Sequence, residues 1–250
     1  MVKNVFQKRL ILLAIIALTL AFGSIFVQLP DFFSFVPDLT LLLFASPLIY
    51  LLIKERNISH ILAATFLFVA GFLLEHLSSL YGFPYGKFSY ANEFLLNLAG
   101  TPIVIGIAWM VIIMGVRFLV PKKLGLIVTL LVSAFLAVAV DLVIDPPAVQ
   151  LGYWTWVETG PYYNIPISNF FGWFLAGLLL TSGIFKLTEN STTEFKASAF
   201  KSLFLIVSYW TFTSIMLGMI VPFIVGISLM ILISRAGGFE GHEKPPAHLS

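Results

Sequence analysis

The sequence contains no cysteine and few charged residues. Among its 250 residues there is no Cys, and Asp, Glu, Lys and Arg together make up 10%. Disulfide bonds, thiolate catalysis and cysteine metal ligands are therefore excluded. The formal net charge of +2 gives no reason to expect a nucleic acid partner. We expect no bound metal, because the histidines lack the spacing of a metal site; they are His60, His76, His242 and His248.

Apolar residues dominate the composition. Hydrophobic residues make up 59% of the chain, and the mean hydropathy is +1.00. A soluble domain of this length would not have such a composition, so we expect a polytopic membrane protein that lies in the lipid bilayer. The 25 phenylalanines exceed what a lipid-facing surface requires. They would suit an interior that accommodates a long apolar ligand, although ordinary core and lipid contacts explain any single one.

Runs of about 20 apolar residues predict the membrane-spanning helices. These runs are Leu10–Leu29, Leu39–Ile53, Ile58–Leu80, Phe94–Val120, Leu124–Ile144, Asn169–Leu187 and Ser202–Ser234. The last run is too long for one ordinary span and is interrupted at Gly218 and Pro222, so it forms one kinked helix or two shorter ones. The expected fold is an all-α bundle of seven to eight transmembrane helices. It forms one domain over residues 1–236, and we expect a disordered polar tail over 237–250.

The basic residues are distributed unevenly between the two sides of the predicted bundle. With the N-terminus inside, the cytoplasmic segments carry Lys3, Lys8, Arg9, Lys54, Arg56, Arg117, Lys122, Lys123, Lys186, Lys196 and Lys201. The opposite loops carry Lys87 alone. This bias predicts a multi-pass protein of the cell membrane with a cytoplasmic N-terminus. Arg235 and Lys244 also lie inside if the last run crosses twice, which favours eight spans over seven.

Two acidic side chains, Glu75 and Asp141, fall inside the predicted spans, and a third, Asp145, directly follows the fifth span. Asp141 and Asp145 share one helix face at i,i+4 spacing, and Pro146 with Pro147 should end the helix after them. The helical rise places Glu75 and Asp141 at a matching depth near the outer face. A carboxyl group at membrane depth is costly and indicates a functional site by default. The alternatives are that Glu75 and Asp141 pair with buried polar groups or with Lys87, and that Asp145 caps or solvates a turn.

Aromatic residues are concentrated in the predicted outer loops and beside Asn169. The residues that we expect to bind the substrate are Tyr85, Tyr90, Tyr153, Trp154, Trp156, Tyr163, Asn169 and Trp173. Taken singly, Tyr and Trp are typical of a belt at the membrane interface. A belt does not explain why G-Y-W-T-W and P-Y-Y-N-I-P occur in one loop. This concentration favours a buried site near the outer face.

Three segments carry a resemblance to a known family. They are E-H-L-S-S-L-Y-G-F-P-Y-G-K-F-S-Y (75–90), D-L-V-I-D-P-P-A-V-Q-L-G-Y-W-T-W (141–156) and G-P-Y-Y-N-I-P-I-S-N-F-F-G-W (160–173). Together they resemble the membrane carotenoid hydratase family over residues 71–177. The resemblance implies addition of water across the terminal 1,2 double bond of an acyclic carotenoid end group, giving a tertiary alcohol. It also implies a long apolar polyene and water as substrates, and other membrane enzymes of the carotenoid pathway as partners.

The residues fit this chemistry independently of the resemblance. Protonating a trisubstituted alkene leaves a tertiary carbocation that water captures, and no cofactor is needed. A carboxyl group kept from water beside a second carboxyl favours its protonated form and can act as a general acid. Aromatic faces stabilise a desolvated cation by about 1–2 kcal/mol each. We therefore assign Glu75, Asp141 and Asp145 as catalytic.

Other classes of membrane protein account for some of the same features. An ion-coupled transporter also uses intramembrane carboxylates and a Pro-broken helix, but no internal repeat is visible and the acidic groups gather at one face. A non-catalytic carotenoid-binding membrane protein is compatible with the composition. An intramembrane prenyltransferase would need a second Asp-rich motif and more basic residues, and a retinal protein would need a Lys within Ser202–Ser234.

Overall fold

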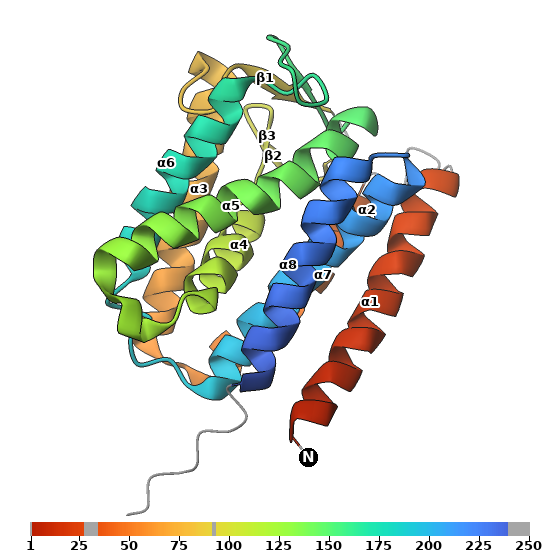
Figure 1. The fold of residues 1–250 in the computed structure, drawn as a ribbon. Helices are drawn as coiled ribbons and strands as arrows, with labels where there is room; N and C mark the ends of the chain where they lie inside the picture. Colours follow the sequence, from red (N-terminus) through yellow and green to blue (C-terminus); the bar gives the residue numbers. More distant parts are fainter. Residues whose placement is uncertain (1, 28–34, 92–93, 240–250) are drawn as a thin grey trace, which may run out of the picture.

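The chain folds into an all-α helical bundle (Figure 1). The computed structural model describes residues 2–27, 35–91 and 94–239. Within these ranges the helices are α1 (Val2–Phe26), α2 (Val36–Glu55), α3 (Ile58–Tyr81), α4 (Ile105–Leu119), α5 (Gly125–Gln150), α6 (Ile167–Ile184), α7 (Thr193–Met216) and α8 (Ile220–Phe239). Seven are long and apolar enough to cross a membrane, and the 15-residue α4 is shorter. The predicted fold class, a polytopic all-α membrane bundle, is confirmed.

Helix α7 lies at the centre of the bundle. It packs against α1, α2, α4, α5 and α8. Helices α3, α4 and α6 form the other part of the bundle, and α5 crosses it obliquely (Figure 1). The connections alternate between the two ends of the bundle. The described residues also form four short strands at the end opposite the N-terminus: β1 (Phe88–Tyr90), β2 (Asn97–Leu98), β3 (Thr101–Pro102) and β4 (Trp154–Trp156).

The predicted last run divides into two helices. Helix α7 ends just before Gly218, whose φ of 76° lies in the left-handed region that suits glycine. Pro222 follows in the first turn of α8, where a missing N–H breaks no hydrogen bond. Helix α8 continues to Phe239 and so includes the first residues of the predicted tail. The remainder of that tail, 240–250, lies outside the described residues.

The predicted fourth span, Phe94–Val120, is helical only in its second part. Its first part forms the antiparallel hairpin of β2 and β3, and the prediction of helix there was wrong. Gly100 turns this hairpin with a φ of 83°, and the Asn97 side chain donates to the Phe94 carbonyl at 2.7 Å. Such local hydrogen bonds compete with a helix, while the apolar composition is the same in either structure.

Helix α5 does not end at its prolines as predicted but continues to Gln150. Pro146 has no N–H to donate to the Leu142 carbonyl, the usual reason for a helix to break. The Tyr162 hydroxyl donates to that carbonyl instead, at 2.9 Å. Burial raises the pKa of Tyr162, so its hydroxyl keeps the proton that this bond requires. A donor from a distant loop thus replaces the bond that proline removes.

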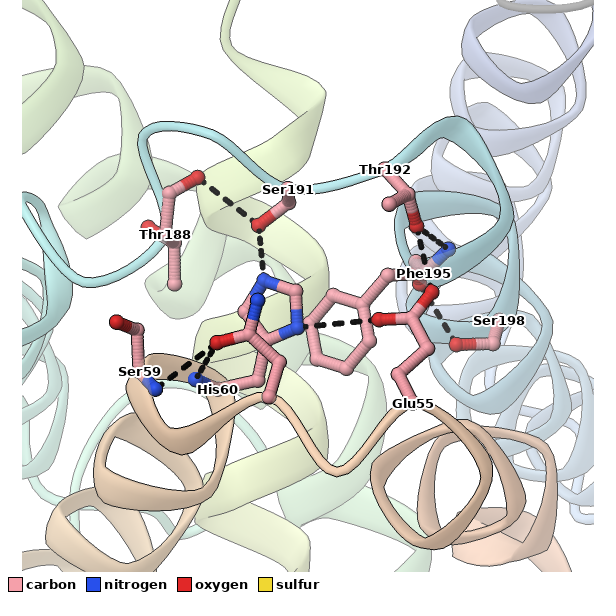
Figure 2. Close-up of polar contacts among 9 residues, drawn as sticks. Glu55, Ser59, His60, Thr188, Ser191, Thr192, Phe195 and Ser198 are labelled. Atoms are coloured by element: carbon pink, nitrogen blue, oxygen red, sulfur yellow. Dashed lines mark hydrogen bonds and ion pairs between the residues drawn. The ribbon is translucent and has the colours of Figure 1, made fainter.

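A polar cluster around His60 joins two loops at the end of the bundle that carries the N-terminus (Figure 2). The buried His60 ring has Nε2 2.9 Å from Ser191 Oγ and Nδ1 3.3 Å from Glu55 Oε2. The ring also stacks on Phe195, with centroids 3.8 Å apart. Thr192 donates to the other Glu55 oxygen at 2.7 Å. These contacts fix the α2–α3 turn against the start of α7.

The hydrogen bond from Tyr162 to the Leu142 carbonyl of α5 can be tested by removing the Tyr162 hydroxyl. We expect Tyr162→Phe to lower the free energy of unfolding by about 1–2 kcal/mol, because the Leu142 carbonyl loses its donor. The neighbouring Tyr163→Phe is the matched control, since Tyr163 contacts Tyr162 through its ring. Thermal unfolding in detergent measures both variants. Equal stability of the two would contradict this role for Tyr162.

Candidate active site

A cavity of about 820 Å³ lies among the helices, next to β1 and β4. The three acidic residues predicted to be catalytic all line it: Glu75 from α3, and Asp141 with Asp145 from α5. Their exposed fractions are only 7%, 1% and 2%. The fold therefore brings together two spans that are far apart in the sequence and buries their carboxyl groups around one space.

Asn169 connects the two aspartates. Its Nδ2 donates to Asp141 Oδ2 at 2.7 Å and to Asp145 Oδ2 at 2.8 Å. A side-chain amide has two hydrogens, so each aspartate receives one of them. Asn169 lies in the first turn of α6, which begins after the extended Pro166. The start of α6 thus fixes the relative position of both carboxyl groups.

Glu75 is held by two aromatic donors. Trp109 Nε1 donates to Oε1 at 2.9 Å, and the Tyr90 hydroxyl donates to Oε2 at 3.0 Å. The Trp109 ring also stacks on Trp173, with centroids 4.2 Å apart. The sequence interpretation missed Trp109, although a signal was present: a Trp inside an apolar span carries an N–H that needs an acceptor.

Two glycines allow the helices of the site to approach closely. A Cβ on Gly71 would overlap Trp109, and a Cβ on Gly172 would overlap Tyr85. Gly71 precedes Glu75 by one helical turn, so the same close approach of α3 and α4 brings Trp109 to the Glu75 carboxyl. Gly172 likewise allows Tyr85 to lie against α6.

Strands β1 and β4 cover one side of the cavity as an antiparallel pair. The paired residues are Phe88 with Trp156, Ser89 with Thr155, and Tyr90 with Trp154. Side chains alternate across a strand, so the four aromatic residues line the cavity while Ser89 and Thr155 are exposed. Trp154 Nε1 also donates to Asp145 Oδ1 at 2.6 Å. The strand pair is therefore attached directly to a carboxyl group of the site.

The structure brings almost all the predicted substrate-binding residues to this cavity. Those that line it are Tyr85, Tyr90, Tyr153, Trp154, Trp156, Asn169 and Trp173. Tyr163 does not line it and instead packs edge-on against Tyr162, with centroids 4.9 Å apart. Further lining residues that the sequence interpretation did not single out are Phe88, Phe94, Trp109, Tyr209 and Trp210.

Two buried donors at the cavity have no partner within the described part of the chain. They are the Tyr85 hydroxyl and Trp156 Nε1. Burial raises the pKa of Tyr85 well above its usual value, so its hydroxyl stays protonated. Buried donors are rarely left unpaired. These two groups are suited to hold a water molecule or a hydroxyl group in the cavity.

His76 has a structural contact rather than a place in the cavity. Its Nδ1 lies 3.0 Å from Thr101 Oγ1 and so links α3 to the β2–β3 hairpin. Among the described residues, no group of three or more His, Asp or Glu side chains is arranged to hold a metal ion.

Comparisons with known proteins identify the family of the chain. The profile of the family described as "Carotenoid biosynthesis protein" matches residues 37–233, which include all three carboxyl groups. The chain belongs to this family. It is also 32% identical over 164 residues to the bisanhydrobacterioruberin hydratase of Haloarcula japonica, covering 63% of this chain and 52% of the relative. The chain thus matches about half the length of that relative. No solved structure matches the chain.

The hydrogen bond from Trp154 of β4 to Asp145 of α5 can be tested by substituting the two tryptophans of β4 in turn. We expect Trp154→Phe to lower the free energy of unfolding by about 1–3 kcal/mol, because a buried oxygen of Asp145 loses its donor. Trp156→Phe should have a smaller effect, since Trp156 Nε1 has no partner within the described residues. Thermal unfolding in detergent compares the two variants. A larger loss for Trp156→Phe would contradict this assignment.

Proposed function

We propose that the protein is a carotenoid hydratase that adds water across the terminal 1,2 double bond of an acyclic carotenoid end group. Membership of the carotenoid biosynthesis family and the name of the Haloarcula relative support a hydratase role. The observation that carries the proposal is the cavity, in which three buried carboxyl groups face aromatic rings. This arrangement suits a reaction that passes through a carbocation and requires no cofactor.

Hydrogen bonding distinguishes the three carboxyl groups. Both oxygens of Glu75 accept a hydrogen bond from a side chain, and so do both oxygens of Asp145. Asp141 accepts one through Oδ2, and its Oδ1 has no hydrogen-bond partner among the described residues. Accepted bonds favour the ionised form of a carboxyl group, whereas a proton requires a free oxygen. We therefore assign Asp141 as the general acid, with Oδ1 carrying the transferred proton.

The proposed reaction proceeds in two steps. The alkene π electrons form a bond from C2 to the proton of Asp141, which leaves a tertiary cation at C1 and an aspartate. A water molecule then forms a bond to C1 through its oxygen and gives a proton back to the Asp141 carboxylate, which restores the acid. The Tyr85 hydroxyl and Trp156 Nε1 are suited to orient this water. The net result is one tertiary alcohol and an unchanged enzyme.

Aromatic rings beside the carboxyl groups are suited to stabilise the cation. Trp109 and Trp173 stack on each other, and the ring centroids of Tyr85 and Trp109 lie 5.9 Å apart. Each ring that faces a desolvated cation contributes about 1–2 kcal/mol. The carboxylates of Glu75 and Asp145 add a favourable charge interaction at the moment when positive charge develops.

We also propose that the N-terminus is cytoplasmic and that the site lies near the outer face of the cell membrane. The basic residues of the α2–α3, α4–α5 and α6–α7 connections lie at the end of the bundle that carries the N-terminus (Figure 1). A cytoplasmic location of this end accords with the usual bias of Lys and Arg.

The assignment of Asp141 can be tested with an amide substitution. Asp141→Asn keeps the shape of the side chain and its bond with Asn169, but an amide cannot deliver the proton. We expect hydration to fall by about 10²–10⁴-fold, the usual contribution of a general acid. Activity is measured with purified protein in detergent as a mass gain of one water per hydrated end, with no ion gradient present.

The control for Asp141→Asn is Thr155→Ala, which alters the exposed face of β4 and should leave turnover unchanged. Normal turnover of Asp141→Asn would remove this residue from the mechanism. If the unsubstituted protein forms no alcohol from any acyclic carotenoid, the hydratase function itself is wrong.

A further inference from the structure

The cavity continues well beyond the carboxyl groups, towards α1 and α2. Its lining there includes Thr19, Leu20, Gly23 and Ser24 of α1, Val27 directly after α1, and Val36, Pro37, Thr40, Leu41 and Phe44 of α2. Helix α1 packs mainly on α7 and α8, and α2 packs mainly on α7 and α4. Figure 1 accordingly shows α1 at the edge of the bundle. The same cavity therefore has a carboxyl end and an α1–α2 end.

The α1–α2 end offers no free donor from α1 for a polar ligand. The hydroxyl of Thr19 donates to the Ile15 carbonyl, and that of Ser24 donates to the Ala21 carbonyl, at 3.0 and 2.9 Å. Hydroxyl groups bonded to their own helix in this way present mainly carbon to the cavity. Apolar side chains make up most of the remaining wall of this part. Such a lining fits a hydrocarbon.

The residues at the α1–α2 end are more exposed than the carboxyl groups at the other end. Val27 is 53% exposed there, whereas Asp141 is 1% exposed. Both α1 and α2 are long and apolar enough to span a membrane. An opening between two membrane-spanning helices faces lipid acyl chains rather than water. A compound dissolved in the bilayer can reach the cavity by this route without crossing an aqueous phase.

From these observations we infer that a long polyene enters from the bilayer between α1 and α2. Its end group then lies at the carboxyl groups, while the remainder of the chain occupies the α1–α2 end. We further infer that Gly23 is a specificity-determining residue that keeps this passage wide enough for a polyene. The inference rests on the proposed hydratase function and adds the route and the position of the substrate.

The surroundings of Gly23 are the observation that singles it out. A Cβ built on Gly23 would meet no atom within 4 Å, although this residue lines the cavity. Glycine inside a helix is less stable than alanine. At Gly71 that loss is offset by close packing with Trp109, but at Gly23 no packing offsets it. Because Gly23 has no side chain and no neighbour takes its place, the space beside it in the cavity stays free.

A graded series at Gly23 tests the passage without disturbing the packing. The variants Gly23→Ala, Gly23→Leu and Gly23→Trp add increasing bulk at a position with free space. Leu18→Trp is the matched control, because Leu18 is exposed on the same helix but does not line the cavity. The two substrates are lycopene, an acyclic carotenoid, and myrcene, a short isoprenoid hydrocarbon with the same end group.

We expect Gly23→Trp to lower the hydration of lycopene at least tenfold and that of myrcene less than twofold, with intermediate effects for Gly23→Leu. Leu18→Trp should leave both rates unchanged. Normal hydration of lycopene by Gly23→Trp would overturn the passage. An equal loss with both substrates would also overturn it, because the substitution would then act on the site itself.

A binding measurement separates the passage from the chemistry. Asp141→Asn, produced in a lycopene-forming host, should retain bound carotenoid after purification, as measured by visible absorbance. The double variant Asp141→Asn, Gly23→Trp should lose most of it. Equal carotenoid content in the single and double variants would overturn the proposed passage, whether or not the protein is a hydratase. Carotenoid bound by the single variant alone would support the passage even without turnover.

Discussion

The structure depends on one constraint: three carboxyl groups are buried among membrane-spanning helices, where an unpaired polar atom is expensive. Asn169 meets the most demanding part of this constraint, because one amide serves Asp141 and Asp145 at the same time. The other donors come from α4 and from the two loops that form β1 and β4. Each aromatic donor therefore has two functions, since its N–H or O–H pairs a carboxyl oxygen while its ring forms the wall of the cavity. The position of these rings is consequently fixed by hydrogen bonds as well as by packing.

Much of this arrangement follows from the sequence, because simple rules govern it. Consecutive spans alternate in direction, so the ends of α3 and α5 and the start of α6 must lie at one end of the bundle. Helical spacing then places Asp141 and Asp145 on one face. The strand pair could also have been anticipated, since Phe88 and Tyr90, like Trp154 and Trp156, alternate with small hydroxyl residues. Tyr163, which the sequence predicts to bind the substrate, does not line the cavity, because its ring packs against Tyr162 instead.

The remaining features depend on contacts between distant segments. The apolar run before α4 is equally compatible with a helix and a hairpin, and local side-chain bonds decide between them. The end of α5 could not be predicted from its prolines, because Tyr162, far along the next loop, supplies the missing donor. The partner of Trp109 is likewise invisible in the sequence. An N–H in an apolar span indicates that an acceptor exists, but only the close approach at Gly71 shows that the acceptor is Glu75.

The two ends of the cavity place opposite demands on the same bundle. The proposed carbocation requires charges and ring faces that are fixed in advance, which calls for a rigid carboxyl end. A polyene that enters from the bilayer requires space that stays unfilled. Glycine meets both demands in different ways. At Gly71 and Gly172 the missing side chain is replaced by a neighbouring aromatic residue, whereas at Gly23 nothing replaces it. Within the described part of the chain, no side-chain donor to the carboxyl groups comes from α1. Changes in α1 can therefore alter which molecules reach the site while the site itself stays the same.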